Sequence, residues 1–272
     1  MKYCLEVDER RRKVDEVLVD LLARVVHFSD THISRFGNFV ETHFDEAVLR
    51  MNDLDPPPDV IVHTGDLTDN GVLEDYEYAF EKLKGLNGKI LITPGNHDER
   101  NYGQSLFREL VGPMDYEYKA GRLAIYLMNS PEPDRDEGRL GRRRQAFLEE
   151  KLGSLPEKYV KIVAFHHHLV PVPHAGRETN VLEDAGDILD LVLTRNVDFV
   201  LMGHRHVSRI LRISNTTLIN AATTSSVRTR GRLGRSFNVI DLFADGSVKI
   251  YEWNVSLDKR ILKAEYPPSL TS

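Results

Sequence analysis

The chain has 272 residues, of which 41% are hydrophobic, and its formal net charge is −6, from 36 basic and 42 acidic residues. This apolar content suits a large α/β domain, and the charge gives no overall attraction to nucleic acid or to an anionic membrane. The single cysteine, Cys4, excludes an intramolecular disulfide and favours a reducing compartment. No apolar run reaches the roughly 18 residues that span a bilayer, so we expect a cytoplasmic protein without a membrane segment.

The first 24 residues are predicted to form a helix. Five apolar residues recur there at i, i+3, i+4 spacing with charges between them, which is typical of an amphipathic helix. They are Val14, Val17, Leu18, Leu21 and Leu22. We therefore expect residues 1–24 to be an N-terminal helical extension, whose apolar stripe packs on its own domain or on a second copy in a homodimer.

Short apolar runs alternate with helical stretches over most of the remaining chain. The runs are 24–28, 60–63, 89–93, 123–128, 160–165 and 197–202, and the helical stretches are 44–51, 73–83, 142–152 and 182–194. Most runs are continuously apolar, as strands buried on both faces are. Four later runs, 210–213, 217–220, 236–243 and 247–253, predict an antiparallel meander that closes a second sheet. The sequence therefore predicts one α/β domain over residues 25–272.

Polar motifs stand at the ends of five of the apolar runs. They are SDTH (29–32), GDLTD (65–69), GNHD (95–98), FHHH (165–168) and GHRH (203–206). Because sites in α/β sheets form beyond the carboxyl ends of the strands, these distant segments can converge. Taken singly, each motif has a simple alternative as turn or surface chemistry. Their joint occurrence in this order favours a common site.

Together the motifs supply too many nitrogen and oxygen ligands for one metal ion and about the right number for two. The candidates are Asp30, His32, Asp66, Asn96, a histidine of the triple, His204 and His206. Mixed imidazole and carboxylate ligation favours Mn, Fe, Zn or Co over Ca or Mg. The glycines before Asp66, Asn96 and His204 fit tight turns that swing these side chains off the strand ends.

The motif order D-x-H, GD, GNH(D/E), H, GH-x-H resembles that of the calcineurin-like metallophosphoesterases, over residues 25 to about 253. The resemblance implies a four-layer αββα sandwich, in which two sheets face each other and helices lie outside. It also implies a cofactor of two divalent transition-metal ions, with manganese favoured. The N-terminal helix would be an addition to this fold.

The resemblance also implies which residues hold which metal. One metal would take Asp30, His32, Asp66 and His206, and the other Asp66, Asn96, His166 and His204, so that Asp66 bridges them. His166 is the first residue after its strand, and His167 is its rival. Side chains alternate along an extended segment, which would place His166 and His168 on one side and His167 on the other.

The expected reaction is in-line attack on phosphorus by a water or hydroxide held between the metals. The resemblance gives His97 the task of assisting the leaving group, as a proton donor or by stabilising its charge. Asp98 could orient the His97 ring through a hydrogen bond. The equal alternative for Asp98 is stabilisation of its own turn.

The substrate is the least constrained part of the prediction. The compact size, FSDTHI, the sequence 169–171 after the His triple and the stretch 141–152 are most like the cyclic-nucleotide phosphodiesterase (class III) branch. We therefore expect a small phosphodiester, such as a cyclic nucleotide. The alternatives are a nuclease of the double-strand-break repair type and a nucleotide-sugar-lipid pyrophosphatase. A non-catalytic metal-binding scaffold is disfavoured, because every ligand position and His97 are present.

Four arginines interleaved with glycines lie late in the chain, at positions 228, 230, 232 and 235. Such a loop could contact a nucleic-acid backbone, but a solvated turn is favoured. In an intermediate interpretation, Arg228 alone reaches the substrate phosphate.

Overall fold

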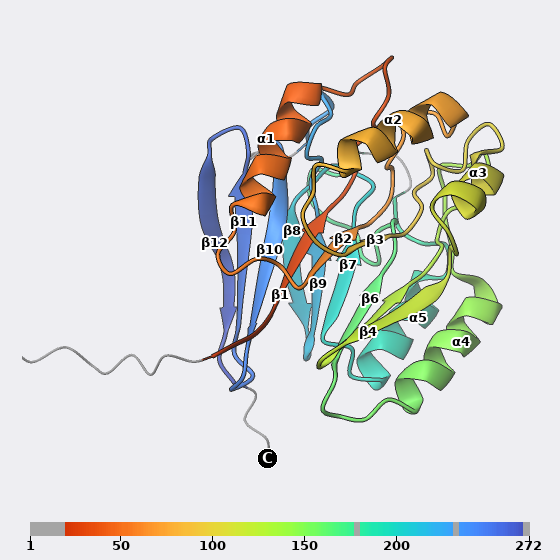
Figure 1. The fold of residues 1–272 in the computed structure, drawn as a ribbon. Coiled ribbons are helices and arrows are strands. Elements are labelled where there is room, and N and C mark those ends of the chain that lie inside the picture. The colour runs from red at the N-terminus through yellow and green to blue at the C-terminus, as the bar shows by residue number, and fades with distance from the viewer. Residues whose placement is uncertain (1–19, 177–179, 231–233, 269–272) are drawn as a thin grey trace, which may run out of the picture.

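The computed structural model describes residues 20–176, 180–230 and 234–268. Two stacked sheets of six strands each lie between helices (Figure 1). The first sheet has the order β12 (Lys259–Tyr266), β11 (Val248–Asn254), β10 (Ser236–Phe243), β1 (Leu21–Phe28), β2 (Val60–His63), β3 (Ile90–Ile92). The second has the order β4 (Tyr116–Ala120), β5 (Leu123–Leu127), β6 (Val160–Ala164), β7 (Phe199–Met202), β9 (Thr216–Asn220), β8 (Arg209–Ile213).

The helices form the two outer layers. They are α1 (Glu41–Asn52), α2 (Leu73–Leu83) and α3 (Gly103–Leu110) beside the first sheet, and α4 (Gly141–Gly153) and α5 (Ala185–Thr194) beside the second (Figure 1). Three apolar clusters fill the three spaces between the four layers. In β1, Val26 faces α1 and α2, whereas Val25 faces the second sheet. The continuous apolar runs are therefore explained by burial on both faces, and the predicted four-layer αββα sandwich is confirmed.

Two of the predicted elements need correction. The predicted N-terminal helix falls mostly on residues 1–19, outside the described part of the chain, as does any dimer contact it would make. Its last residues are not helical, because Leu21 begins β1 and pairs with Phe243 of β10. The apolar residues at helical spacing there also continue directly into the buried run of β1. The four late runs do not form one meander, since β10 and β11 join the first sheet and β8 and β9 the second.

The other predicted elements match closely, and β2, α2 and β10 have the predicted bounds. Three elements were not predicted: β4, α3 and β12. The strands β4 and β12 are edge strands with partly exposed, charged residues, so they lack the continuous apolar signal. Among the described residues, no helix combines the length and apolarity that crossing a membrane requires.

A buried ion pair joins β1 to β10 inside the first sheet. Arg24 Nε and Nη2 donate to the two carboxylate oxygens of Asp241 over 2.6 and 2.9 Å, and both side chains are about 5% exposed. Arg24 Nη1 also donates to the carbonyl of Pro56 over 2.6 Å. This pair fixes the register between the two ends of the chain, because Arg24 lies directly opposite Asp241.

We expect Asp241→Ala to lower the free energy of unfolding by roughly 3–5 kcal/mol, because it leaves a buried guanidinium unpaired. Urea unfolding followed by circular dichroism measures the change. The matched control is Glu149→Ala, which removes the partner of Arg195 in an exposed pair and should cost less than about 1 kcal/mol. Equal losses in the two variants would contradict a structural role for the buried pair.

Candidate metal centre

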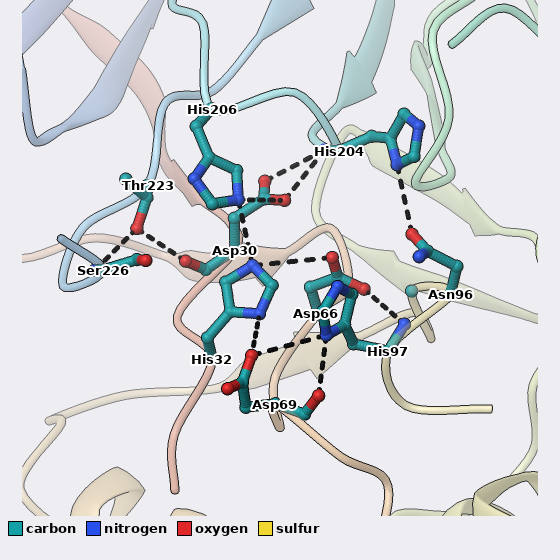
Figure 2. Close-up of polar contacts among 12 residues, drawn as sticks. Asp30, His32, Asp66, Asp69, Asn96, His97, His204, His206, Thr223 and Ser226 are labelled. Atoms are coloured by element: carbon teal, nitrogen blue, oxygen red, sulfur yellow. Dashed lines mark hydrogen bonds and ion pairs between the residues drawn. The ribbon is translucent and has the colours of Figure 1, made fainter. Parts of the chain in front are cut away.

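The seven predicted ligands converge at one end of the sandwich, although they come from both sheets. Figure 2 labels all of them except His166. Loops after β1, β2 and β3 carry Asp30, His32, Asp66 and Asn96, and loops after β6 and β7 carry His166, His204 and His206. All seven side chains are buried. The site therefore lies where the carboxyl ends of the parallel strands of both sheets meet, as the motif positions predict.

One group of donor atoms gathers around the Nε2 atom of His32. His206 Nε2 lies 2.9 Å from it, and Asp66 Oδ2 lies 3.6 Å from it. Asp30 Oδ1 completes the group at 3.5 Å from His206 Nε2. These atoms belong to the four residues predicted for one metal.

A second group gathers around the Nε2 atom of His166. Asn96 Oδ1 lies 3.1 Å away, His204 Nδ1 lies 3.2 Å away, and Asp66 Oδ2 lies 3.4 Å away. Asn96 Oδ1 is also 3.1 Å from His204 Nδ1. The same oxygen of Asp66 thus takes part in both groups.

The donor set fits divalent metal ions. Metal–nitrogen and metal–oxygen bonds of about 2.0–2.2 Å place neighbouring ligand atoms on one ion about 3–3.5 Å apart, which is the spacing found here. The donors are imidazole nitrogens, two carboxylates and an amide oxygen, a mixture that transition metals accept more readily than calcium or magnesium does. His32 Nδ1 faces the Asp69 carboxylate and His206 Nδ1 donates to the Arg228 carbonyl, so a neutral ring at either position turns the lone pair of its Nε2 atom toward the centre, as metal binding requires.

Five of these residues hold an unusual backbone conformation. Positive φ angles occur at Asp30 (53°), His32 (49°), Asp66 (53°), His204 (78°) and His206 (55°). The left-handed region is uncommon for residues other than glycine, and it persists where the surroundings enforce it. This backbone strain, which the sequence did not reveal, turns each side chain from its strand end toward the common centre.

Two of the motif glycines are required by space rather than by turn conformation. A Cβ atom on Gly95 would overlap the backbone nitrogen of Asp66, and one on Gly203 would overlap Ser29 Oγ. The motif loops therefore pack backbone against backbone. The sequence predicted turns at these glycines, and the structure shows that close approach of neighbouring loops is the reason.

Asp30 ties the two sheets together. Both of its carboxylate oxygens accept a hydrogen bond from the backbone nitrogen of His204, each over 3.0 Å, and its carbonyl accepts one from Thr223 Oγ1 over 2.6 Å. Ser225 Oγ donates to the neighbouring carbonyl of Thr31 over 2.7 Å. Sequence reasoning missed Thr223 and Ser225, for which the only signal is a run of small hydroxyl residues directly after β9.

The charges at the centre are strongly coupled. Burial raises the pKa of Asp30 to about 6. Burial would also raise the pKa of Asp66, but the neighbouring His166 and His97 outweigh it and hold this pKa well below its usual value. Burial opposes protonation of His166, yet the Asp66 carboxylate raises its pKa to about 9. The pocket thus concentrates negative charge, which neighbouring histidines offset.

Asp98 binds the backbone of its own turn and of the GDLTD loop and does not hydrogen-bond the His97 ring. Of its two predicted roles, the contacts therefore favour stabilisation of the turn and correct the expectation that it orients the ring. Its carboxylate accepts hydrogen bonds from the backbone nitrogens of Leu67 (3.1 Å), Thr68 (2.8 Å) and Gly95 (2.9 Å). These bonds hold the GDLTD and GNHD loops against each other. The physical reason is that a fully buried carboxylate needs several donors, which these two loops supply.

Asp69 takes the place expected for Asp98. The His97 Nδ1 atom donates to the Asp69 carbonyl over 2.6 Å, and the Asp69 carboxylate lies 3.4 Å from the same nitrogen. That carboxylate also lies 3.0 Å from His32 Nδ1. Burial lowers the pKa of His97, but Asp66 and the bond to Asp69 outweigh it and raise this pKa overall. The second aspartate of GDLTD was the available sequence signal.

The histidine triple divides into different environments. His166 reaches the centre, and its Nδ1 donates to the carbonyl of Thr64 over 2.8 Å, so its Nε2 is left to face Asp66. The ring of His167 instead lies between Ser130 Oγ (2.9 Å) and the carbonyl of Asp136 (3.1 Å). The geometry therefore favours His166 over His167 as the ligand.

Of the late arginine run, Arg228 touches the centre through its backbone. Its carbonyl accepts a hydrogen bond from His206 Nδ1, which orients that ring. Arg230 Nη1 donates to the carbonyl of Ala175 over 2.7 Å. A contact between the Arg228 side chain and substrate stays a prediction.

Solved structures share this fold. Purple acid phosphatase PPD1 from yellow lupin aligns with a TM-score of 0.71 at 15% identity, over 90% of this chain and 53% of that chain. A dimetal phosphatase from Danio rerio aligns with a TM-score of 0.68 at 12% identity, over 90% of this chain and 100% of that chain. At such identities the likeness concerns the fold alone.

Curated relatives are similar in sequence. The probable glycerophosphodiester phosphodiesterase GpdQ of Arcobacter nitrofigilis is 31% identical over 159 residues, which are 53% of this chain and 56% of that protein. The chain thus aligns with little more than half of that relative. The 3',5'-cyclic adenosine monophosphate phosphodiesterase CpdA of Escherichia coli K12 is 25% identical over 248 residues, 83% of this chain and 87% of that protein.

The family description "Calcineurin-like phosphoesterase" matches residues 23–208, which is more than half of the chain and includes all seven converging residues. The chain therefore belongs to the calcineurin-like phosphoesterase family and is a metal-dependent phosphoesterase.

Proposed function

We propose that this protein hydrolyses a small phosphodiester with two divalent metal ions. The observation that carries the proposal is the position of Asp66 Oδ2, which lies 3.6 Å from His32 Nε2 and 3.4 Å from His166 Nε2. One oxygen shared by two donor groups is what a bridging carboxylate requires. Ions held by these residues would supply the activation of a water molecule and would offset the charge of the phosphoryl oxygens.

The proposed ligand sets follow the two groups of donor atoms. Asp30, His32, Asp66 and His206 hold one ion, and Asp66, Asn96, His166 and His204 hold the other. Asn96 contributes a neutral oxygen, so the second set carries less negative charge than it would with a carboxylate at that position. Manganese is the first choice within the class of metals that accept this donor mixture.

His97 is proposed to assist the leaving group. Its ring stands edge-on to that of His32, with 4.5 Å between the centroids, so it borders the metal centre. Because Nδ1 donates to the Asp69 carbonyl, Nε2 can donate to a departing oxygen only from the doubly protonated ring. Burial disfavours that form, but Asp66 and the bond to Asp69 outweigh burial and raise the pKa of His97 toward it. Asp69 thereby fixes the direction in which the ring can act.

The choice of a diester rests on the relatives. The names of both sequence relatives described above specify phosphodiester hydrolysis, although their substrates differ. A cyclic nucleotide is the first substrate to test, because the relative named for it aligns with most of this chain. No contact of the described residues specifically favours nucleic acid, since Arg230 bonds the chain's own backbone.

The Mn-loaded protein is expected to hydrolyse bis-(4-nitrophenyl) phosphate and cyclic AMP faster than 4-nitrophenyl phosphate. A matched panel that adds single-stranded DNA measures the preference by kcat/KM for each compound. Faster turnover of the monoester would contradict the proposed substrate class. Turnover of DNA above both small diesters would favour the nuclease alternative.

Asp66→Asn is expected to reduce the bound Mn²⁺ at both positions and to lower kcat/KM by at least about 10³-fold, because the substituted amide cannot bridge two cations as a carboxylate does. Metal content after dialysis and hydrolysis of the chromogenic diester give the two readouts. The control is Glu149→Gln on the exposed face of α4. Two tightly bound Mn²⁺ ions in the Asp66→Asn protein would remove the bridging role.

His97→Ala is expected to keep both metal ions and to lose roughly 10²–10⁴-fold in kcat, the usual contribution of a positioned proton donor. The loss should be larger for cyclic AMP, whose leaving alkoxide needs a proton, than for the 4-nitrophenyl diester, whose leaving group does not. Single-turnover rates with both substrates measure the difference. An equal loss with both substrates would assign His97 to phosphate binding instead.

A further inference from the structure

The side chain of Asn96 can point into the centre with either of two ends. An amide has an oxygen and a nitrogen end of almost the same shape, and only the oxygen end can bind a cation. Asn96 is 3% exposed, so water does not decide which end points inward. If the amide were reversed, its N–H donors would face the nitrogens of His166 and His204, and the second group of donors would keep the oxygen of Asp66 but lose the amide oxygen.

The structure contains a partner that distinguishes the two ends. Asn96 Nδ2 donates to Asp136 Oδ1 over 3.0 Å, while Asn96 Oδ1 points to the two histidines. A carboxylate can only accept hydrogen bonds, so it binds the nitrogen end and rejects the oxygen end. Asp136 lies in the loop after β5 and belongs to none of the five motifs that were identified in the sequence.

Arg100 fixes the carboxylate itself. Its Nη2 atom donates to the same Asp136 Oδ1 over 2.8 Å, so one oxygen accepts from both the guanidinium and the amide. The Asp136 side chain is 70% exposed, and a lone carboxylate of that exposure would sample several rotamers. The second bond selects the rotamer that meets Asn96.

His167 anchors the backbone of this loop. Its Nε2 atom faces the Asp136 carbonyl at 3.1 Å and must be the protonated nitrogen, because a carbonyl only accepts. Its Nδ1 atom then accepts from Ser130 Oγ, which in turn accepts from the backbone nitrogens of His166 and His167, each over 3.2 Å. One tautomer of His167 therefore satisfies all of these hydrogen bonds. The role that this assigns to His167 is to hold the loop in place, while its neighbour His166 is the proposed metal ligand.

The packing of the loop supports this anchor. Pro131 and Gly138 form an antiparallel bridge that closes the loop, and a Cβ atom on Gly138 would overlap His167 Nδ1. The loop therefore packs directly against the buried His167 ring. This packing places Asp136 beside Asn96.

We propose that Asp136 is a positioning residue, whose carboxylate holds the Asn96 amide with its oxygen toward the second metal ion. The proposal rests on the dinuclear centre of the proposed function. It assigns the histidine triple two tasks, since His166 supplies a donor atom and His167 holds the loop that orients another donor.

Metal binding tests the proposal without any measurement of activity. Metal-free protein is titrated calorimetrically with Mn²⁺, and we expect Asp136→Ala to weaken one of two binding events by roughly 10–100-fold and to leave the other unchanged. Asp136→Asn should restore most of the affinity, because both observed bonds go to Oδ1, which an amide oxygen can replace. Glu137→Ala, which removes the neighbouring carboxylate of the same loop, is the matched control and should bind as the parent does.

A double substitution tests whether Asp136 affects the second metal site through the Asn96 amide. In an Asn96→Ala background, Asp136→Ala should cause no further loss at the second site, since the group that it orients is already gone. An additional loss of 10-fold there would overturn the proposal, as would parental affinity at both sites in the single Asp136→Ala protein.

The side-chain amide resonance of Asn96 tests the contact in metal-free protein. It is identified by its absence from the Asn96→Ala spectrum, and Asp136→Ala should move it and speed its exchange with water. An unchanged resonance would overturn the role of Asp136 even if two Mn²⁺ ions bind. A parent protein that binds one Mn²⁺ would refute the dinuclear centre, while this resonance still decides whether Asp136 holds the amide.

Discussion

The structure depends on the contact between the Asp30 carboxylate and the backbone nitrogen of His204. This contact joins the first sheet, which carries Asp30, to the second, which carries His204. The first sheet carries Asp30, His32, Asp66 and Asn96, and the second carries His166, His204 and His206, so the two donor groups come together only where the ends of the sheets meet. The apolar space between the sheets sets their separation, and the Asp30 bond sets how their ends meet. Left-handed turns then direct the ligands into the narrow space between the loops.

Burial of these polar side chains costs free energy unless they are hydrogen-bonded. In this fold, neighbouring loops supply the hydrogen bonds. Each loop that carries a ligand is held by a hydrogen bond from another loop: Thr223 supports Asp30, Asp98 supports the backbone beside Asp66, and Asp69 supports both His32 and His97. The outward Nδ1 atoms of His32, His166 and His206 are engaged by a carboxylate or a carbonyl oxygen, which orients their Nε2 atoms toward the centre. The remaining negative charge of Asp30 and Asp66 is what bound cations would balance.

The sequence predicted the layers and the residues that converge at one end of them, because both leave strong local signals. Continuous apolar runs mark strands buried on two faces, and a polar motif directly after such a run marks a site at its carboxyl end. Edge strands such as β4 and β12 carry no such signal, because half of their residues are charged and exposed. Asp69, Asp136 and Thr223 were missed for another reason. Their roles come from contacts between loops that are distant in sequence, which no periodicity records.

The position of β1 between β2 and β10 determines when the first sheet can be completed during synthesis. One neighbour of β1 is β2, which follows it closely, but the other is β10, near the far end of the chain. All seven ligands through His206 are synthesised before residues 236–243, so a nascent chain holds a complete set of ligands while β1 still has an unpaired edge. The closing strands contribute no ligand, yet the loop that carries Asp30 and His32 is anchored on a sheet that they complete. The ribosome must therefore release the chain through β10 before the sheet that anchors Asp30 and His32 can be completed.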